Sequence, residues 1–192
     1  MLSPRRLKFT VCIALVIGLT HLVIKERAEA GVEVYLTLKQ ALLLAFKGSQ
    51  EVKIGRVSLS REQRLRIEAR AGYRFRQTRS TIYRGVTGEK TDGYALVMHE
   101  KGKSEPITFM VVIDPKGKVK DVYLMVYREP RGGEVRQRRF LRQFIGKSSR
   151  DPLRITQDIV YISGATLSSR SLAVGVKKAL ALVEEVYLKG ER

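Results

Sequence analysis

The sequence predicts an α+β fold: an antiparallel sheet flanked by helices, with a membrane or signal segment at the N-terminus. Three apolar segments at residues 93–100, 106–113 and 119–127 are joined by short turns, which is typical of an antiparallel meander. A strongly amphipathic helix comes near the end of the chain. Its apolar residues share one helix face: Leu172, Val176, Ala179, Leu180, Val183 and Tyr187.

The first 30 residues have the pattern of an export or membrane signal. Basic residues at Arg5, Arg6 and Lys8 precede an apolar run over residues 9–24. Ala28-x-Ala30 is a candidate signal-peptidase site, and a retained signal anchor is the alternative that we favour. Either way, the positive-inside rule places the remaining chain on the extracytoplasmic, periplasmic side of the inner membrane.

Residues 31–91 are predicted to form an N-terminal extension of the main domain, with helices and some strands. A capping box at Thr37 starts a helix over residues 37–46, and residues 51–57 predict a short strand. A second capping box at Ser60 starts a very basic helix that ends before Gly72. Residues 73–86 alternate weakly and predict an edge strand.

Residues 92–192 predict the main domain. After the three strands, residues 134–144 predict a helix that stops at Gly146, and residues 153–162 predict a last strand. That strand would lead into a turn of small residues over 163–169, followed by the amphipathic helix. The chain is thus divided into segments 1–30, 31–91 and 92–192.

The chain is strongly basic. Lys and Arg number 37 against 19 Asp and Glu, a net charge of +18, which suggests nucleic acid, an anionic membrane or an acidic partner. No zinc-finger spacing or aromatic RNA-binding motif accompanies the charge, so we expect no nucleic-acid partner. The densest group of basic residues comprises Arg136, Arg138, Arg139 and Arg142.

Metal, nucleophilic and nucleotide chemistry have little support. Cys12 is the only cysteine, which excludes a disulfide within the chain, and the two histidines, His21 and His99, stand in no ligand or triad spacing. Glycine-rich nucleotide motifs are also missing from the sequence.

The turn Ser163-Gly164-Ala165-Thr166-Leu167-Ser168-Ser169 is the main candidate site. Gly164 permits close backbone approach, and Ser168 or Ser169 would cap the helix. Because the first N–H groups of a helix attract anions, a phosphate would sit beside Thr166. The alternative is a polar turn that caps a helix and binds nothing.

Ser-Gly-Ala-Thr-x-Ser-Ser resembles the flavin-attachment motif of the FMN-binding domain family, which includes flavin-carrying subunits of Rnf-type and sodium-translocating NADH:quinone reductase complexes. The resemblance covers residues 92–186 and implies FMN as cofactor, joined to Thr166 through a phosphoester by a magnesium-dependent flavin transferase that uses FAD. It implies that the neighbouring residues surround the phosphate: Ser163, Gly164, Ala165, Leu167 and Ser169.

The resemblance also implies a second contact with the flavin, from the loop at residues 129–133, through Glu129 and Gly132. The family commonly has a Glu-Thr-Pro-Gly-like sequence there, whereas this chain has Glu-Pro-Arg-Gly-Gly. The acid that the family commonly carries three positions before the motif serine is replaced by Val160.

The expected function is that of a membrane-associated flavoprotein that passes electrons to redox partner proteins as part of a complex, rather than acting as a stand-alone catalyst. The flavin supplies the redox chemistry and the protein its attachment and orientation. Two alternatives remain: a domain that binds flavin without a covalent bond, and a basic membrane-anchored module that binds an acidic partner and carries no cofactor.

Overall fold

The computed structural model describes residues 32–189, so the N-terminal segment, with its apolar run and Cys12, lies outside the described residues. The described chain contains a six-stranded antiparallel sheet with the strand order β1-β6-β5-β4-β3-β2. The predicted α+β class is confirmed. Its strands are β1 (Glu33–Val34), β2 (Glu51–Ser58), β3 (Arg79–Thr87), β4 (Lys90–Lys101), β5 (Pro106–Ile113) and β6 (Val119–Tyr127).

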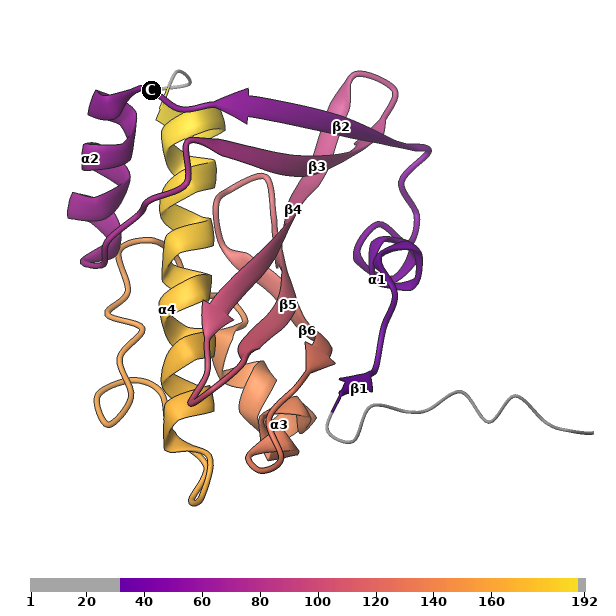
Figure 1. Ribbon diagram of the computed structural model, residues 1–192. Coiled ribbons are helices and arrows are strands. Elements are labelled where there is room, and N and C mark those ends of the chain that lie inside the picture. Colours follow the sequence, from indigo (N-terminus) through magenta and orange to yellow (C-terminus); the bar gives the residue numbers. More distant parts are fainter. Residues whose placement is uncertain (1–31, 190–192) are drawn as a thin grey trace, which may run out of the picture. The chain divides into compact units, whose positions relative to one another are not determined.

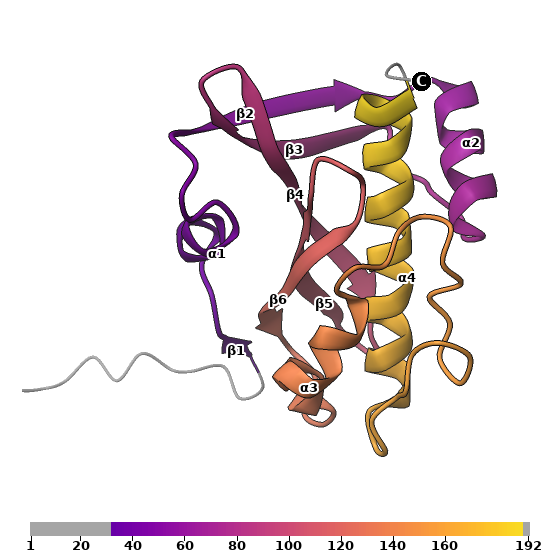
Figure 2. The same ribbon diagram turned by 180° about the vertical axis from the view of Figure 1, so that it is seen from behind.

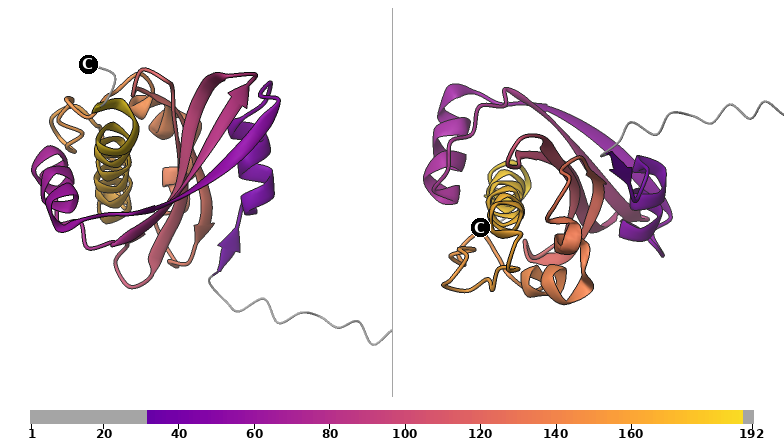
Figure 3. Two further views of the ribbon diagram at one scale, coloured as in Figure 1. Left: turned by 90° about the horizontal axis from the view of Figure 1, so that it is seen from above. Right: turned by 60° about the horizontal axis from the view of Figure 1, so that its bottom comes forward.

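Helices cover both faces of the sheet (Figures 1 and 3). The long helix α4 and the basic helix α2 lie on one face, and α1 lies on the other (Figure 2). The helical elements are α1 (Leu38–Ala45), α2 (Arg61–Ala71), η1 (Gly133–Arg136), α3 (Arg138–Leu141), η2 (Arg142–Phe144), α4 (Thr166–Val183) and η3 (Glu184–Leu188).

The central strand β5 explains why the sheet needs cover on both faces. Seven of its eight residues are buried, which is the continuous apolar pattern of a strand enclosed from both sides. Phe109 and Val111 belong to the large core under α4, whereas Met110 and Val112 belong to a smaller core under α1.

Helix α4 is buried more completely than its amphipathic pattern predicts. The predicted apolar face is buried at Leu172, Val176 and Val183, and residues on its other sides are buried too. Gly175 lets the helix approach the sheet closely, because a Cβ there would lie 2.4 Å from Cζ of Phe109. Helix α4 therefore packs closely against β4 and β5, and this packing fixes the position of its N-terminus.

The predicted helices at residues 37–46 and 60–71 are confirmed with their capping boxes. The side chains of Thr37 and Ser60 accept hydrogen bonds from the third residue of each helix, and α2 ends at the left-handed Gly72. The three predicted strands of the meander are also confirmed. The expected boundary at residue 92 falls within β4, in a continuous sheet; the division of the chain stays a prediction.

The predicted strand at residues 153–162 is wrong. This segment is irregular, with Leu153 and Thr156 at positive φ. The carboxylate of Asp158 accepts hydrogen bonds from the backbone N–H of Leu153 and Arg154 at 3.0 and 2.7 Å. The side chain of Gln143 binds both the N–H and the carbonyl of Val160. Side chains thus satisfy the backbone groups that a neighbouring strand would otherwise bind.

The predicted helix at residues 134–144 is only partly right, because it forms as three short pieces, η1, α3 and η2. Its backbone leaves the helical region at Gln137 (φ −61°, ψ 131°), between η1 and α3. Two of the four clustered arginines contact other parts of the fold: Arg138 pairs with Asp121 at 2.7 Å, and Arg136 lies over the ring of Tyr35. Within residues 32–189, no helix combines the length and apolar character needed to cross a bilayer.

Candidate functional site

The candidate site begins with a tight turn at the base of α4. The N–H of Ala165 donates to the carbonyl of Ile162 at 2.9 Å, and Gly164 between them has φ +79°. A positive φ at the third residue of such a turn is the position that favours glycine. The turn delivers the chain directly into α4, whose first residue is Thr166.

The N-terminus of α4 has no side-chain cap. Ala165 occupies the capping position, and the N–H groups of Thr166, Leu167 and Ser168 have no acceptor in the part of the chain that the structure describes. The predicted cap at Ser168 or Ser169 is therefore wrong. Both serines are buried within the helix, where Ser169 Oγ accepts from the N–H of Ile162. An uncapped helix end leaves these donors and the helix dipole available to an anion.

A hydrogen-bonded link ties this helix end to the loop after β6. Tyr127 is buried and its hydroxyl donates to the carbonyl of Arg131 at 2.7 Å. Because that donation uses its single proton, the hydroxyl of Ser168 donates to Tyr127 Oη, 2.8 Å away. Burial raises the pKa of Tyr127, which keeps the phenol protonated. Tyr127 thus holds two parts of the chain together that are about 40 residues apart.

Glu129 has a structural role in this loop. Its buried carboxylate accepts hydrogen bonds from the N–H groups of Ser104 and Glu105 at 2.6 and 3.0 Å, at the turn between β4 and β5. Burial alone would raise the pKa of Glu129, but the hydrogen bonds from backbone N–H groups outweigh it and lower the pKa. Glu129 therefore fixes the β4–β5 turn against the loop.

This lowered pKa predicts a pH dependence. A carboxylate with a depressed folded pKa stabilises the protein above its unfolded pKa, about 4.3, and that contribution is lost as the pH falls through the folded pKa. We expect Glu129→Gln to lower the free energy of unfolding by about 1–2 kcal/mol at pH 7. Urea unfolding of both proteins from neutral pH to pH 3 measures the difference. It should shrink below about pH 4; a constant difference would contradict this role.

The turn and the loop form the walls of an open pocket of about 660 Å³. This volume lies within the range of small-molecule sites, about 300–1,000 Å³. The pocket brings together five of the eight predicted site residues: Glu129, Gly164, Ala165, Thr166 and Leu167. Of the four other lining residues, Pro130 and Arg131 belong to the 129–133 loop that is expected to contact the flavin, whereas Lys103 and Ser168 are not predicted to line the site.

The other three predicted residues lie beside the pocket rather than on its wall. Ser163 is exposed in the turn, and Ser169 is enclosed in α4. Gly132 is buried behind the wall at φ +90°, where a Cβ would lie 2.7 Å from Tyr127 Oη and 3.1 Å from Ser168 Oγ. A contact between FMN and these three residues stays a prediction.

The pocket suits a phosphate group. The three unsatisfied N–H groups of α4 lie at one wall, while the exposed side chains of Lys103 and Arg131 add two positive charges. The hydroxyl of Thr166 is half-buried and makes no hydrogen bond to any residue of the range 32–189. Leu167 and Pro130 supply apolar surface beside it.

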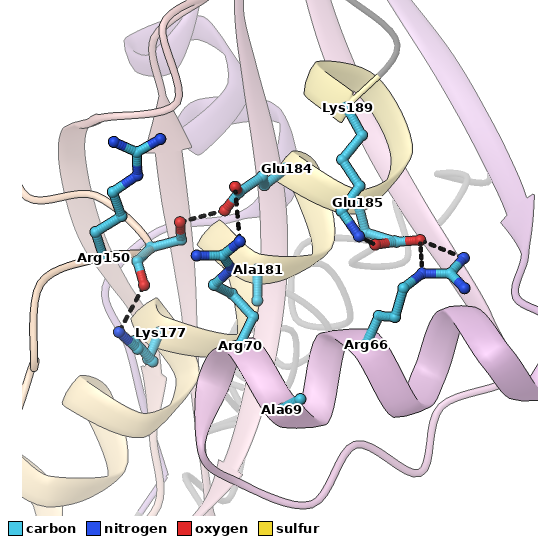
Figure 4. Close-up of a pocket in the computed structure, with 10 residues that line it drawn as sticks. Arg66, Ala69, Arg70, Arg150, Lys177, Ala181, Glu184, Glu185 and Lys189 are labelled. Atoms are coloured by element: carbon cyan, nitrogen blue, oxygen red, sulfur yellow. Dashed lines mark hydrogen bonds and ion pairs between the residues drawn. The ribbon is translucent and has the colours of Figure 1, made fainter. Parts of the chain in front are cut away.

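A second cavity, of about 530 Å³, lies between α2 and the other end of α4 (Figure 4). Its carboxylates are already neutralised: Glu185 pairs with Arg66 and Lys189, and Glu184 with Arg70. The buried Lys177 donates to the carbonyls of Ser149 and Asp151, and burial lowers its pKa. These contacts hold α2 and the segment at residues 149–151 against α4, which is a structural role.

Metal ligands do not gather in the described range 32–189, where no group of three His, Cys, Asp or Glu side chains could hold an ion. His99 instead makes a 3.0 Å hydrogen bond to the hydroxyl of Thr108 on the neighbouring strand β5.

The fold and the pocket are those of an α+β domain with a phosphate-compatible site at a helix N-terminus. Residues 102–181 match the model of the FMN-binding domain, and this range includes both the 129–131 loop and the 163–167 turn. Over these residues the chain is similar to the FMN-binding domain family, and this similarity indicates FMN as the cofactor.

Among solved structures, NqrC from Shewanella oneidensis is similar, with a TM-score of 0.52 and 15% sequence identity. The match covers 76% of this chain and 91% of NqrC, and at this identity it supports a shared fold. No curated protein sequence matches the chain significantly.

Proposed function

We propose that the chain is a membrane-associated flavoprotein that carries FMN as a phosphoester on Thr166 and acts in electron transfer within a protein complex. The observation that carries this proposal is the position of the Thr166 hydroxyl. It is half-buried, unbonded within the described chain and located at an uncapped helix end inside the pocket. The family match favours this function over a cofactor-free basic module.

The attachment needs an outside enzyme. Threonine is a weak nucleophile without a base, and the only carboxylate among the described lining residues, Glu129, is engaged by two backbone N–H groups. With FAD as donor, a flavin transferase would join Thr166 Oγ1 to the FMN phosphorus and release AMP. The threonine proton would leave to a base of that enzyme. The exposed turn at residues 163–164 gives such an enzyme access.

The chain's own residues would hold the cofactor at three points. The N–H groups of Thr166, Leu167 and Ser168 would bind the phosphate, and Lys103 and Arg131 would balance its charge. Leu167 and Pro130 would supply apolar contacts for the ring. When bound, FMN supplies the redox chemistry, and the protein supplies its attachment, orientation and charge environment. The exposed pocket leaves the ring accessible to redox partner proteins.

The N-terminal segment supports membrane association. We propose that it anchors the chain in the inner membrane with the flavin domain on the periplasmic side, where the family's redox complexes would provide partners. The basic residues that precede the apolar run, Arg5, Arg6 and Lys8, support this orientation.

Co-expression with a flavin transferase tests the covalent bond. The purified protein should be yellow, and after denaturation it should keep flavin fluorescence in the gel. Colour in the native protein that is lost on denaturation would contradict the phosphoester and leave a non-covalent flavin protein. A colourless native protein would contradict the proposed function altogether.

The potential of the flavin should respond to Arg131. A flavin gains negative charge on reduction, and the Arg131 cation stabilises that charge. Replacing Arg131 with alanine removes this stabilisation. A surface charge contributes about 1 kcal/mol or less, and for a two-electron couple this converts to a midpoint potential lower by about 20 mV. A spectroscopic redox titration measures it, with Arg128→Ala, outside the pocket, as control. An unchanged potential would remove Arg131 from the site.

A further inference from the structure

Helix α1 is oriented opposite to a usual surface helix. It packs the small residues Ala41 and Ala45 against the sheet, fully or almost fully buried, while three of its four leucines are exposed and the fourth, Leu42, is half-buried against the smaller core. Leu43 is 65% exposed, Leu44 48% and Leu38 41%. A helix that only covers a sheet would bury its larger apolar residues, so the outward leucines need another partner.

The edge strand β2 extends this apolar surface. Val52 and Ile54 are exposed, and Val52 shares with α1 an apolar groove of about 590 Å³. Val57 of β2 instead packs against the core on the α4 side, which places Val52 and Ile54 on the α1 side by strand alternation. We call the combined surface the α1 face; it comprises Leu38, Leu43, Leu44, Val52 and Ile54.

Basic residues border the α1 face. Lys39 and Lys47 are exposed on and just after α1, and the helix itself contains no acidic residue. By strand alternation, the exposed Arg56 of β2 lies on the same side of the sheet as Val52 and Ile54. Outward leucines flanked by lysines are the pattern of helices that lie in the interface of an anionic bilayer.

The sequence places this face near the proposed anchor. Only residues 25–32 separate the apolar run from β1, and α1 begins four residues after β1 ends. Eight residues span at most about 28 Å, so the anchor keeps the α1 face close to the bilayer at a high effective concentration.

We propose that the α1 face rests on the surface of an anionic bilayer. This inference rests on the proposed membrane anchoring of the chain. Because α1 and α4 cover opposite faces of the sheet (Figure 3), the flavin pocket at the base of α4 then lies on the side of the sheet away from the lipid. The pocket would remain open to redox partners in solution or in a complex.

The full chain offers a clean labelling test, because Cys12 is its only cysteine. In a Cys12→Ser background, Leu43→Cys carries an environment-sensitive fluorophore. Leu65→Cys is the matched control, since Leu65 is a leucine of similar exposure on α2, at the other face of the sheet. Both proteins are reconstituted in phosphatidylcholine vesicles with a minority of phosphatidylglycerol, with and without lipid that carries a nitroxide at its headgroup.

We expect the nitroxide lipid to reduce the emission at position 43 about twofold or more and to leave position 65 nearly unchanged. Flotation of the vesicles reports the anchor separately. A chain that floats while its position-43 label is unquenched overturns this inference and leaves the anchoring intact. A chain that does not float overturns both. A label shielded from aqueous iodide but not quenched by the lipid overturns it in favour of a protein covering, from residues 1–31 or another chain.

Discussion

Thr166→Ala should abolish covalent flavin incorporation. The substitution removes the only side-chain oxygen that we expect to bond to the phosphorus, and Ser163, Ser168 and Ser169 cannot replace it. Ser168 and Ser169 are buried and hydrogen-bonded, and Ser163 lies outside the pocket wall. In-gel fluorescence of the denatured protein, after co-expression with the transferase, should fall to background.

Thr166→Ser is the matched control because it keeps a hydroxyl at the same position. We expect it to retain part of the covalent flavin, while Ser163→Ala should retain nearly all of it. Circular dichroism would check that Thr166→Ala still folds. We expect it to fold, because the Thr166 side chain makes no hydrogen bond to residues 32–189 and does not cap α4. Persistent fluorescence of denatured Thr166→Ala would place the attachment elsewhere.

Gly132→Ala should disrupt the site far more than Gly164→Ala. Both glycines have φ values near +80 to +90°, so either substitution strains the backbone by about 1 kcal/mol. At Gly132 the added Cβ would also lie 2.7 Å from the buried hydroxyl of Tyr127. Relieving that contact breaks the link from Tyr127 to Arg131 and Ser168, at a further cost of about 1–3 kcal/mol.

Chemical denaturation of the two variants measures this difference directly. We expect Gly132→Ala to lose about 2–4 kcal/mol of unfolding free energy and most of its flavin loading, because the loop and the helix end separate. Gly164→Ala should lose about 1 kcal/mol, since nothing lies within 4 Å of its added Cβ. Equal losses in the two variants would show that the Tyr127 link does not hold the pocket together.

The features that the sequence predicts well are those with local causes. The capping boxes at Thr37 and Ser60 act over three residues, and both helices start where these residues stand. The meander depends on short turns between alternating segments, and its three strands form as expected. The long helix near the end of the chain follows from its amphipathic pattern, although it begins at Thr166 and not after a cap at Ser168 or Ser169.

The features that it predicts poorly depend on tertiary hydrogen bonds. The segment at residues 153–162 has the apolar residues of a strand, but Asp158 and Gln143 bind its backbone instead. Lys103 carries no motif, and it reaches the pocket because Glu129 joins the β4–β5 turn to the 129–133 loop. Tyr127 could be suspected only as a polar aromatic residue at the end of a buried strand, which is a weak signal.

The covalent bond at Thr166 is tested most directly by peptide mapping of the protein isolated from its own cells with the flavin-transferase machinery active. The account predicts an intact mass larger by one FMN less one water, with the added mass on the peptide that contains Ser-Gly-Ala-Thr and on Thr166 within it. A protein of unmodified mass, or an added flavin on any other residue, would contradict it.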